Sequence, residues 1–181
     1  MTGIDLTRRC VELTRRRFER EGLCSDLRIM DAERLQFPDS PFDVVYSFGV
    51  LHHVPSPESA FSEVRRVLRP GGTFLGAVYN RWSVVTAAIM GQWLASGGWR
   101  REGLQGRIAR IEHSVTSSDP GPYVRLFGAH ELKRALESAG FHDVSIVKRH
   151  LGLRKLGRRL PTPVIDIAGS LAGWYLVYRA H

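Results

Sequence analysis

Two acidic side chains follow short apolar runs near the start of this chain, where each run ends. The run Gly3–Leu6 contains Asp5, and the run Leu27–Met30 is followed by Asp31 and then by Ala32. A carboxylate offers two acceptor oxygens, so an acid at such a place can hold a ligand by hydrogen bonds. Taken alone, Asp5 is better explained as a loop residue or a helix N-cap, and only the order of several such features favours a binding role.

A third apolar run is longer and is followed by two histidines. The run Phe42–Phe48 is nearly continuous, which predicts a strand buried on both faces. Ser47 lies near its end, and His52 and His53 follow in the next turn. Imidazoles can act as catalytic bases, but side chains of this kind more often pack or hydrogen-bond beside a ligand.

The elements that position these residues alternate between strand and helix. Over the first 80 residues the order is strand, helix, strand, strand, helix, strand, with Thr7 as N-cap of the first helix and Ser56 and Pro57 opening the second. Residues 70–72 (Pro-Gly-Gly) are expected to end that helix and turn the chain into a strand over 73–79. This rhythm indicates an α/β fold with a mostly parallel sheet, whose strand ends share the edge where ligands of open sheets bind.

The rest of the chain predicts one continuing domain over residues 1–181. Residues 80–127 break the rhythm and predict a helical insertion, which contains Trp82, Trp93 and Trp99. A helix over 129–139, a strand over 143–148 and a last strand over 174–180 follow.

Composition excludes several classes of protein. The chain has 181 residues and two cysteines, Cys10 and Cys24, and neither lies in a Cys-x-x-Cys pair, so a disulfide scaffold and a zinc ribbon are excluded and no metal site is predicted. No secretory signal and no apolar stretch of spanning length is visible, so we expect a cytoplasmic protein. The net charge of +8 indicates a solvated basic surface rather than a nucleic-acid partner, because no aromatic residues are interleaved among the arginines.

These features in order resemble one known family. Asp5, the stretch DAERLQFPDSPFD from Asp31 onward, and FDVVYSFGVLHHVPSPESAFSEVRRVLRPGGTF resemble the class I S-adenosylmethionine-dependent methyltransferases, in particular the type 11 and ubiquinone/menaquinone group. The resemblance runs from Gly3 to about Ala77 and continues more loosely through HELKRALESAGFHDVSI and the last strand. It implies a Rossmann-like sheet with an antiparallel last strand, S-adenosylmethionine as cofactor, and methyl transfer to a small molecule.

The resemblance also implies a role for each strand end. The first acid would accept hydrogen bonds from both ribose hydroxyls, the second would accept from the adenine amine, and the alanine after it would leave room for the ring. The end of the third run would line the methionine side of the cofactor. The implied cofactor-binding residues are Asp5, Leu6, Asp31, Ala32, Ser47 and Phe48.

The catalytic residue and the methyl acceptor stay open at this point. A general base is needed only if the acceptor loses a proton, and the candidates are His52, His53, Tyr79 and His113. The tryptophans of the insertion could form an apolar or aromatic acceptor pocket or fill an ordinary core. The basic, leucine-containing stretch 151–160 could make a weak contact with an anionic membrane, although a solvated surface is the better explanation. Oligomeric state is not predicted.

The chain departs from the family at one place. Members open with a strand, a glycine-rich loop and a helix before the acid at the position of Asp5, and no such unit precedes Asp5 here. That strand would lie centrally, between the strands that end at Asp5 and Phe48, so its loss would leave two unpaired strand edges. We therefore expect a fragment, a mis-assigned start or a degenerate copy that alone binds the cofactor weakly or not at all.

Three other functions were weighed against this one. A non-catalytic methyltransferase-like remnant, serving as an interaction module, is the main alternative. A nicotinamide dehydrogenase also carries an acid after its second strand, but the Asp31-Ala32 step and the expected antiparallel finish disfavour it. A nucleic-acid methyltransferase is disfavoured because FGVLHH occupies the place of an N/D-P-P-Y-like motif.

Overall fold

A computed structural model describes residues 1–100, 103, 106–109, 123–150 and 169–181. The first half of the chain forms β1 (Thr2–Asp5), α1 (Arg8–Arg20), β2 (Asp26–Ile29), β3 (Phe42–Phe48), α2 (Pro57–Val67) and β4 (Leu68–Tyr79). The second half forms α3 (Val84–Ala95), a 3₁₀ turn η1 (Gly98–Arg100), α5 (Ala129–Ser138), β5 (Ser145–Arg149) and β6 (Tyr175–Ala180). His113 and the basic stretch 151–160 lie outside the described residues.

The predicted helix starts are confirmed by their capping bonds. The Thr7 side chain accepts the Cys10 backbone N–H at 3.3 Å, which satisfies one of the free amides at the start of α1. Ser56 caps α2 in the same way, and Pro57 occupies the first turn, where a missing N–H costs nothing.

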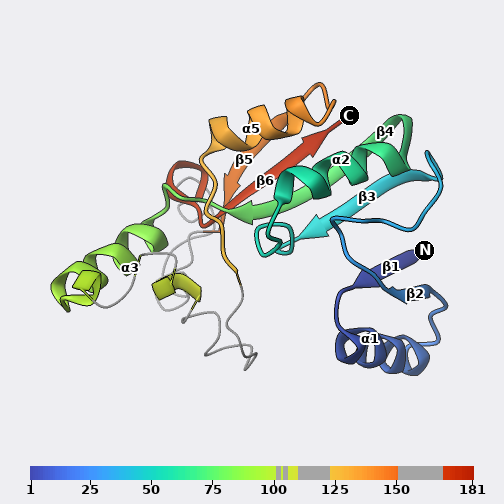
Figure 1. Ribbon diagram of the computed structural model, residues 1–181, viewed down its shortest axis with the longest axis horizontal. Helices are drawn as coiled ribbons and strands as arrows, with labels where there is room; N and C mark the ends of the chain where they lie inside the picture. Colours follow the sequence, from blue (N-terminus) through green and yellow to red (C-terminus); the bar gives the residue numbers. More distant parts are fainter. Residues whose placement is uncertain (101–102, 104–105, 110–122, 151–168) are drawn as a thin grey trace.

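The strands form two separate sheets (Figure 1). β1 and β2 pair in parallel, and a four-stranded sheet has the order β3-β4-β6-β5. In the larger sheet β3 and β4 are parallel, and β6 runs antiparallel to both of its neighbours. This confirms the predicted α/β class, with the last strand reversed. Within the part of the chain that is described, no strand pairs with the outer edge of β1 or of β3.

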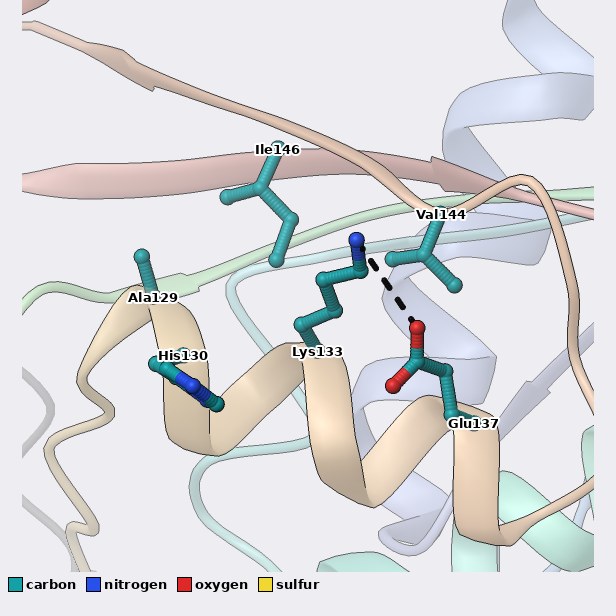
Figure 2. A pocket seen from close by; sticks show the side chains of 6 residues that line it. All are labelled: Ala129, His130, Lys133, Glu137, Val144 and Ile146. Carbon is teal, nitrogen blue, oxygen red and sulfur yellow. Dashed lines mark ion pairs between the residues drawn. The ribbon is translucent and has the colours of Figure 1, made fainter.

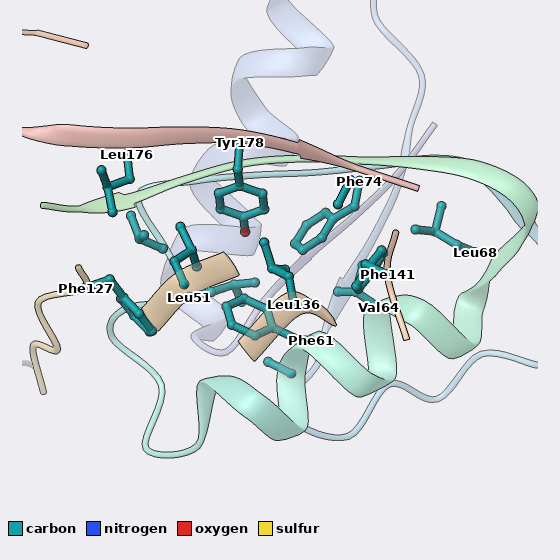
Figure 3. Packing of buried hydrophobic residues seen from close by; sticks show 14 residues of the cluster. Leu51, Phe61, Val64, Leu68, Phe74, Phe127, Leu136, Phe141, Leu176 and Tyr178 are labelled. Carbon is teal, nitrogen blue, oxygen red and sulfur yellow. The ribbon is translucent and has the colours of Figure 1, made fainter. Parts of the chain in front are cut away.

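Helices α2 and α5 cover one face of the larger sheet and enclose the main core (Figure 3). Leucines and valines of the helices meet aromatic rings of β4 and β6 there, and Phe61 of α2 lies within 6.5 Å of the rings of Phe74, Phe127 and Tyr178. Burying such side chains contributes roughly 1.5–3 kcal/mol each, so this layer holds the sheet to its helices.

The other face of β3 differs from the prediction. The run was expected to be buried on both sides, but Val44, Tyr46 and Phe48 are 54%, 69% and 47% exposed. Alternate side chains of a strand point to opposite faces, so Val45 turns toward the α2 side while these three turn away from it. No described segment buries that second face. The prediction of two-sided burial is therefore wrong for these residues.

The Pro-Gly-Gly turn also differs from the prediction. β4 begins at Leu68, directly after α2, so Pro70, Gly71 and Gly72 lie within the strand. The register shifts there, because Phe42 lies opposite Leu68 whereas Val44 lies opposite Thr73. The tripeptide thus lies in an irregular stretch of β4, and Gly71 suits it because its φ is 74°.

Candidate functional site

The parallel pair β1–β2 brings the two predicted acids to the same end of neighbouring strands. Asp5 lies opposite Ile29, and the Met30 N–H donates to the Asp5 carbonyl at 2.9 Å. Asp31 follows directly, so both acids lie where these strands end. The larger sheet ends in the same manner at Ser47 and Phe48, the last residues of β3.

Each acid uses one carboxylate oxygen for a local turn. Asp5 Oδ1 accepts the backbone N–H and the hydroxyl of Thr7, both at 2.8 Å, and Asp31 Oδ1 accepts the Glu33 N–H at 2.9 Å. The second oxygen of each carboxylate has no hydrogen-bond partner among the described residues. The turn role that the sequence suggested for Asp5 is present, and it leaves an acceptor available to a ligand.

The loop after β2 is fastened to α2 by one arginine. The Arg66 guanidinium donates to the carbonyls of Leu35 and Phe37, both at 2.8 Å, and pairs with Glu63 and Asp39. Its hydrogen bond holds the pKa of Glu63 below the usual range. This clamp fixes the loop that begins at Asp31 and Ala32. This clamp was not predicted from the sequence, although Glu63 and Arg66 lie one helical turn apart.

Aromatic rings meet where β3 and β4 end. Tyr79, the last residue of β4, lies 5.4 Å from Tyr175 and 4.4 Å from Trp174, and Tyr175 lies 5.1 Å from Phe48 (ring centroids). The sequence suggested such a cluster among the tryptophans of the insertion, but Trp82 is 69% exposed. The tryptophan of this cluster, Trp174, directly precedes β6. The signal missed was the aromatic pair Trp174 and Tyr175 at the start of the predicted last strand.

The two histidines after β3 have different environments. His52 is buried between Tyr79 and His53, at ring distances of 3.9 and 4.1 Å, and neither of its nitrogens has a hydrogen-bond partner in the described part of the chain. Burial, with a smaller contribution from His53, lowers the pKa of His52 to about 2. His53 is half-buried, and its Nδ1 lies 2.8 Å from the Tyr123 carbonyl oxygen.

Two surface grooves lie beside helices α5 and α1. The larger, of about 610 Å³, runs between α5 and the edge strand β5, where Lys133 and Glu137 form an ion pair at 3.8 Å (Figure 2). The smaller, of about 240 Å³, lies between α1 and β2. Neither groove is lined by any of the six residues predicted to bind the cofactor.

The donor set at these strand ends suits part of a nucleoside. No group of three or more histidine, cysteine or acidic side chains is placed to hold a metal ion within the described ranges. Two carboxylates with free oxygens at adjacent strand ends suit the hydroxyl and amine donors of a nucleoside. No helix in the described ranges combines the length and the hydrophobicity that crossing a membrane requires.

Comparison with known sequences finds methyltransferases among the relatives of this chain. Residues 1–76 match the family model described as a methyltransferase domain. A sterol 24-C-methyltransferase of Gibberella zeae is 30% identical over 125 residues, which is 68% of this chain and 28% of that protein. A ubiquinone biosynthesis O-methyltransferase of Paramagnetospirillum magneticum is 37% identical over 103 residues, 54% of this chain and 41% of that protein.

A third relative extends this range of acceptors. A phosphatidylethanolamine N-methyltransferase of Cereibacter sphaeroides is 42% identical over 74 residues, 40% of this chain and 36% of that protein. The chain thus spans between about a quarter and two fifths of the length of these relatives.

Solved structures share the fold. A Thermotoga maritima S-adenosylmethionine-dependent methyltransferase, described as a possible histamine N-methyltransferase, superposes with a TM-score of 0.63 at 20% identity, covering 98% of this chain and 71% of that one. The [4+2]-cyclase SpnF superposes with a TM-score of 0.60 at 21% identity, covering 99% and 64%. Because the second protein is named as a cyclase, the shared fold alone does not fix the reaction.

Proposed function

Because this chain belongs in family and fold to the class I S-adenosylmethionine-dependent methyltransferases, we propose that it carries the nucleoside-binding half of a site that methylates an apolar or lipid-like small molecule. The observation that carries the proposal is the placement of Asp5 and Asp31 at the same end of neighbouring parallel strands, each with a free carboxylate oxygen. Family and fold imply S-adenosylmethionine as the cofactor.

The bound cofactor would supply an electrophilic methyl group, and the protein's task would be to hold and orient the reactants. Asp5, beside Leu6, would accept hydrogen bonds from the ribose hydroxyls, and Asp31, beside Ala32, from the adenine amine. The Arg66 clamp would hold the second of these sites in place. Ser47 and Phe48 would line the methionine side.

Two observations support an apolar or lipid-like methyl acceptor. The relatives act, by name, on sterols, a ubiquinone precursor and phosphatidylethanolamine, which are all largely apolar or lipid-like. In this chain, Phe48, Tyr79, Trp174 and Tyr175 gather aromatic surface where the strands end. Aromatic rings of this kind bind flat or apolar molecules through large contact areas.

The site needs one more strand to become a closed pocket. β1 and β3 each present an edge that no described strand pairs, and the exposed Val44, Tyr46 and Phe48 lie beside that edge on β3. Parallel strands are normally buried on both faces and paired on both edges. We propose that a further parallel strand and its helix complete the sheet in the working protein.

Titration calorimetry tests this completion. Residues 1–181 alone are expected to show no micromolar binding of S-adenosylmethionine, because one wall of the pocket is open. A chain extended upstream in its reading frame with a strand, a glycine-rich loop and a helix is expected to bind it. Micromolar binding by residues 1–181 alone would refute the need for a further strand.

Asp5→Asn tests the nucleoside site. The variant is made in residues 1–181 or in the chain extended upstream, whichever binds S-adenosylmethionine. The amide oxygen can still accept the Thr7 bonds, but the negative charge facing the ribose is lost, so the Kd for S-adenosylmethionine is expected to rise about 10- to 100-fold. Asp26→Asn is the matched control, because Asp26 starts β2 at the other end of the same strand pair and is expected to leave the Kd unchanged. Equal effects of the two variants would refute the assignment.

A further inference from the structure

His52 and His53 are adjacent in sequence, but the structure gives them opposite properties. His52 is enclosed by Tyr79 and His53, and its pKa of about 2 keeps it neutral at any physiological pH. A group that solvent cannot reach and that resists protonation is unsuited to receiving a proton in each turnover. Its role is to fill the space behind the other two rings.

His53 is held in one tautomer. Its Nδ1 lies 2.8 Å from the Tyr123 carbonyl oxygen, and a carbonyl only accepts, so the hydrogen of this bond is on Nδ1. A neutral imidazole carries a single N–H, so Nε2 is left with a lone pair. Nε2 has no hydrogen-bond partner among the described residues, and the side chain is half-buried rather than enclosed. The result is an oriented proton acceptor.

The position of His53 is next to the end of the parallel strands. It follows β3 by five residues, and its ring meets the Tyr79 ring edge-on, with centroids 5.9 Å apart, at the last residue of β4. Tyr79 in turn contacts the aromatic rings of Trp174 and Tyr175. The ring of His53 therefore borders the aromatic surface proposed above to receive the acceptor, at the edge where ligands of such sheets bind.

We propose that His53 is the general base of the reaction and that the acceptor therefore loses a proton as it is methylated, as a phenol or an enol does; this inference rests on the proposed function. With a hydroxyl acceptor, Nε2 takes the hydroxyl proton while the oxygen forms a bond to the methyl carbon. The carbon–sulfur bond breaks with its electron pair remaining on sulfur, and the imidazolium then releases its proton to solvent. Tyr123 holds the ring by its carbonyl and stabilises the imidazolium that forms.

The first test needs neither cofactor nor turnover. Long-range ¹H–¹⁵N NMR of residues 1–181 at mildly alkaline pH distinguishes a ring nitrogen that carries hydrogen from one that does not. His53, assigned by loss of its signals in His53→Asn, is expected to carry hydrogen on Nδ1 and none on Nε2. Hydrogen on Nε2 would overturn the proposal.

The second test separates a base from a merely structural residue. In the form that binds S-adenosylmethionine, His53→Asn is expected to lower kcat for an alkyl catechol about 100-fold or more, while its amide keeps the bond to Tyr123. With 4-nitrocatechol, which is already ionised at the assay pH, the variant and the wild type are expected to differ by less than about 3-fold. His130→Asn, an exposed histidine on α5, is the matched control and is expected to keep wild-type rates on both acceptors.

Each other outcome has a defined meaning. Equal slowing on both acceptors would show a structural role and overturn the proposal, as would no slowing on either. If the wild-type protein binds the cofactor but methylates neither catechol, the NMR test decides, and hydrogen on Nε2 of His53 overturns the proposal. Failure of every form to bind S-adenosylmethionine would refute the proposed function itself, whereas binding together with the wrong His53 tautomer would refute this inference alone.

Discussion

Gly76→Ala is expected to lower the free energy of unfolding by about 3 kcal/mol, at the upper end of the range for overpacked cores. Gly76 of β4 lies directly opposite Tyr178 of β6, and a methyl group at Gly76 would overlap the hydroxyl oxygen and the ring of that tyrosine. The ring cannot retreat, because it is buried against Phe61 and Phe74. The strand pair or the core must shift to admit the methyl group.

Urea unfolding of Gly76→Ala beside Gly91→Ala measures this effect. Gly91 lies within α3, and a methyl group there meets nothing within 4 Å, so the control is expected to be neutral or to stabilise by up to about 1 kcal/mol through helix propensity. A loss below about 1 kcal/mol in Gly76→Ala would show that the Tyr178 ring is free to move.

This glycine illustrates what the sequence could not predict. Gly76 stood in a predicted strand with no sign of its partner, because Tyr178 is about a hundred residues away and meets it only through the β4–β6 pairing. By contrast, the caps at Thr7 and Ser56 were predictable, since each depends on residues within three positions. Contacts between residues close in sequence could be predicted, whereas packing between residues distant in sequence could not.

The contacts of the candidate site also differ in whether they could be predicted from the sequence. The placement of Asp5 and Asp31 followed from two parallel strands that end in an acid, which is a local pattern repeated. The Arg66 clamp joins α2 to a loop about 30 residues earlier, and the ring of Trp174 reaches Tyr79 from across the chain. Neither contact leaves a periodic signal in sequence, so both required the structure.

The prediction that β3 is buried on both faces was wrong for a related reason. An apolar run predicts that a strand is buried, but burial of the second face depends on another layer that the run itself does not encode. Val44, Tyr46 and Phe48 carry the composition of a buried strand, and no described segment covers them. Their sequence and their exposure together are the strongest argument that the sheet accepts a further strand and helix.

His52 is expected to make the protein sensitive to acid. Its pKa in the folded protein is about 2, against 6.5 for an ordinary histidine, so below pH 6.5 the unfolded chain binds a proton that the folded protein does not. The contribution of neutral His52 to the free energy of unfolding is therefore fully present above pH 6.5. It falls by about 1.4 kcal/mol for each pH unit below that value. At about pH 4.5 the loss attributable to this one side chain is expected to reach about 3 kcal/mol.

His52→Leu isolates this contribution, because the other titrating groups are present in both proteins. Leucine removes two buried nitrogens that have no described partner and keeps apolar contact with Tyr79, so the variant is expected to unfold at a similar urea concentration at neutral pH. On acidification the variant should become the more stable protein, by an amount that grows with each pH unit. A difference in unfolding free energy between the two proteins that stays constant from about pH 7 to pH 4.5 would show that His52 is protonated in the folded protein as readily as in the unfolded chain. The low pKa could then no longer be used to exclude His52 as the base.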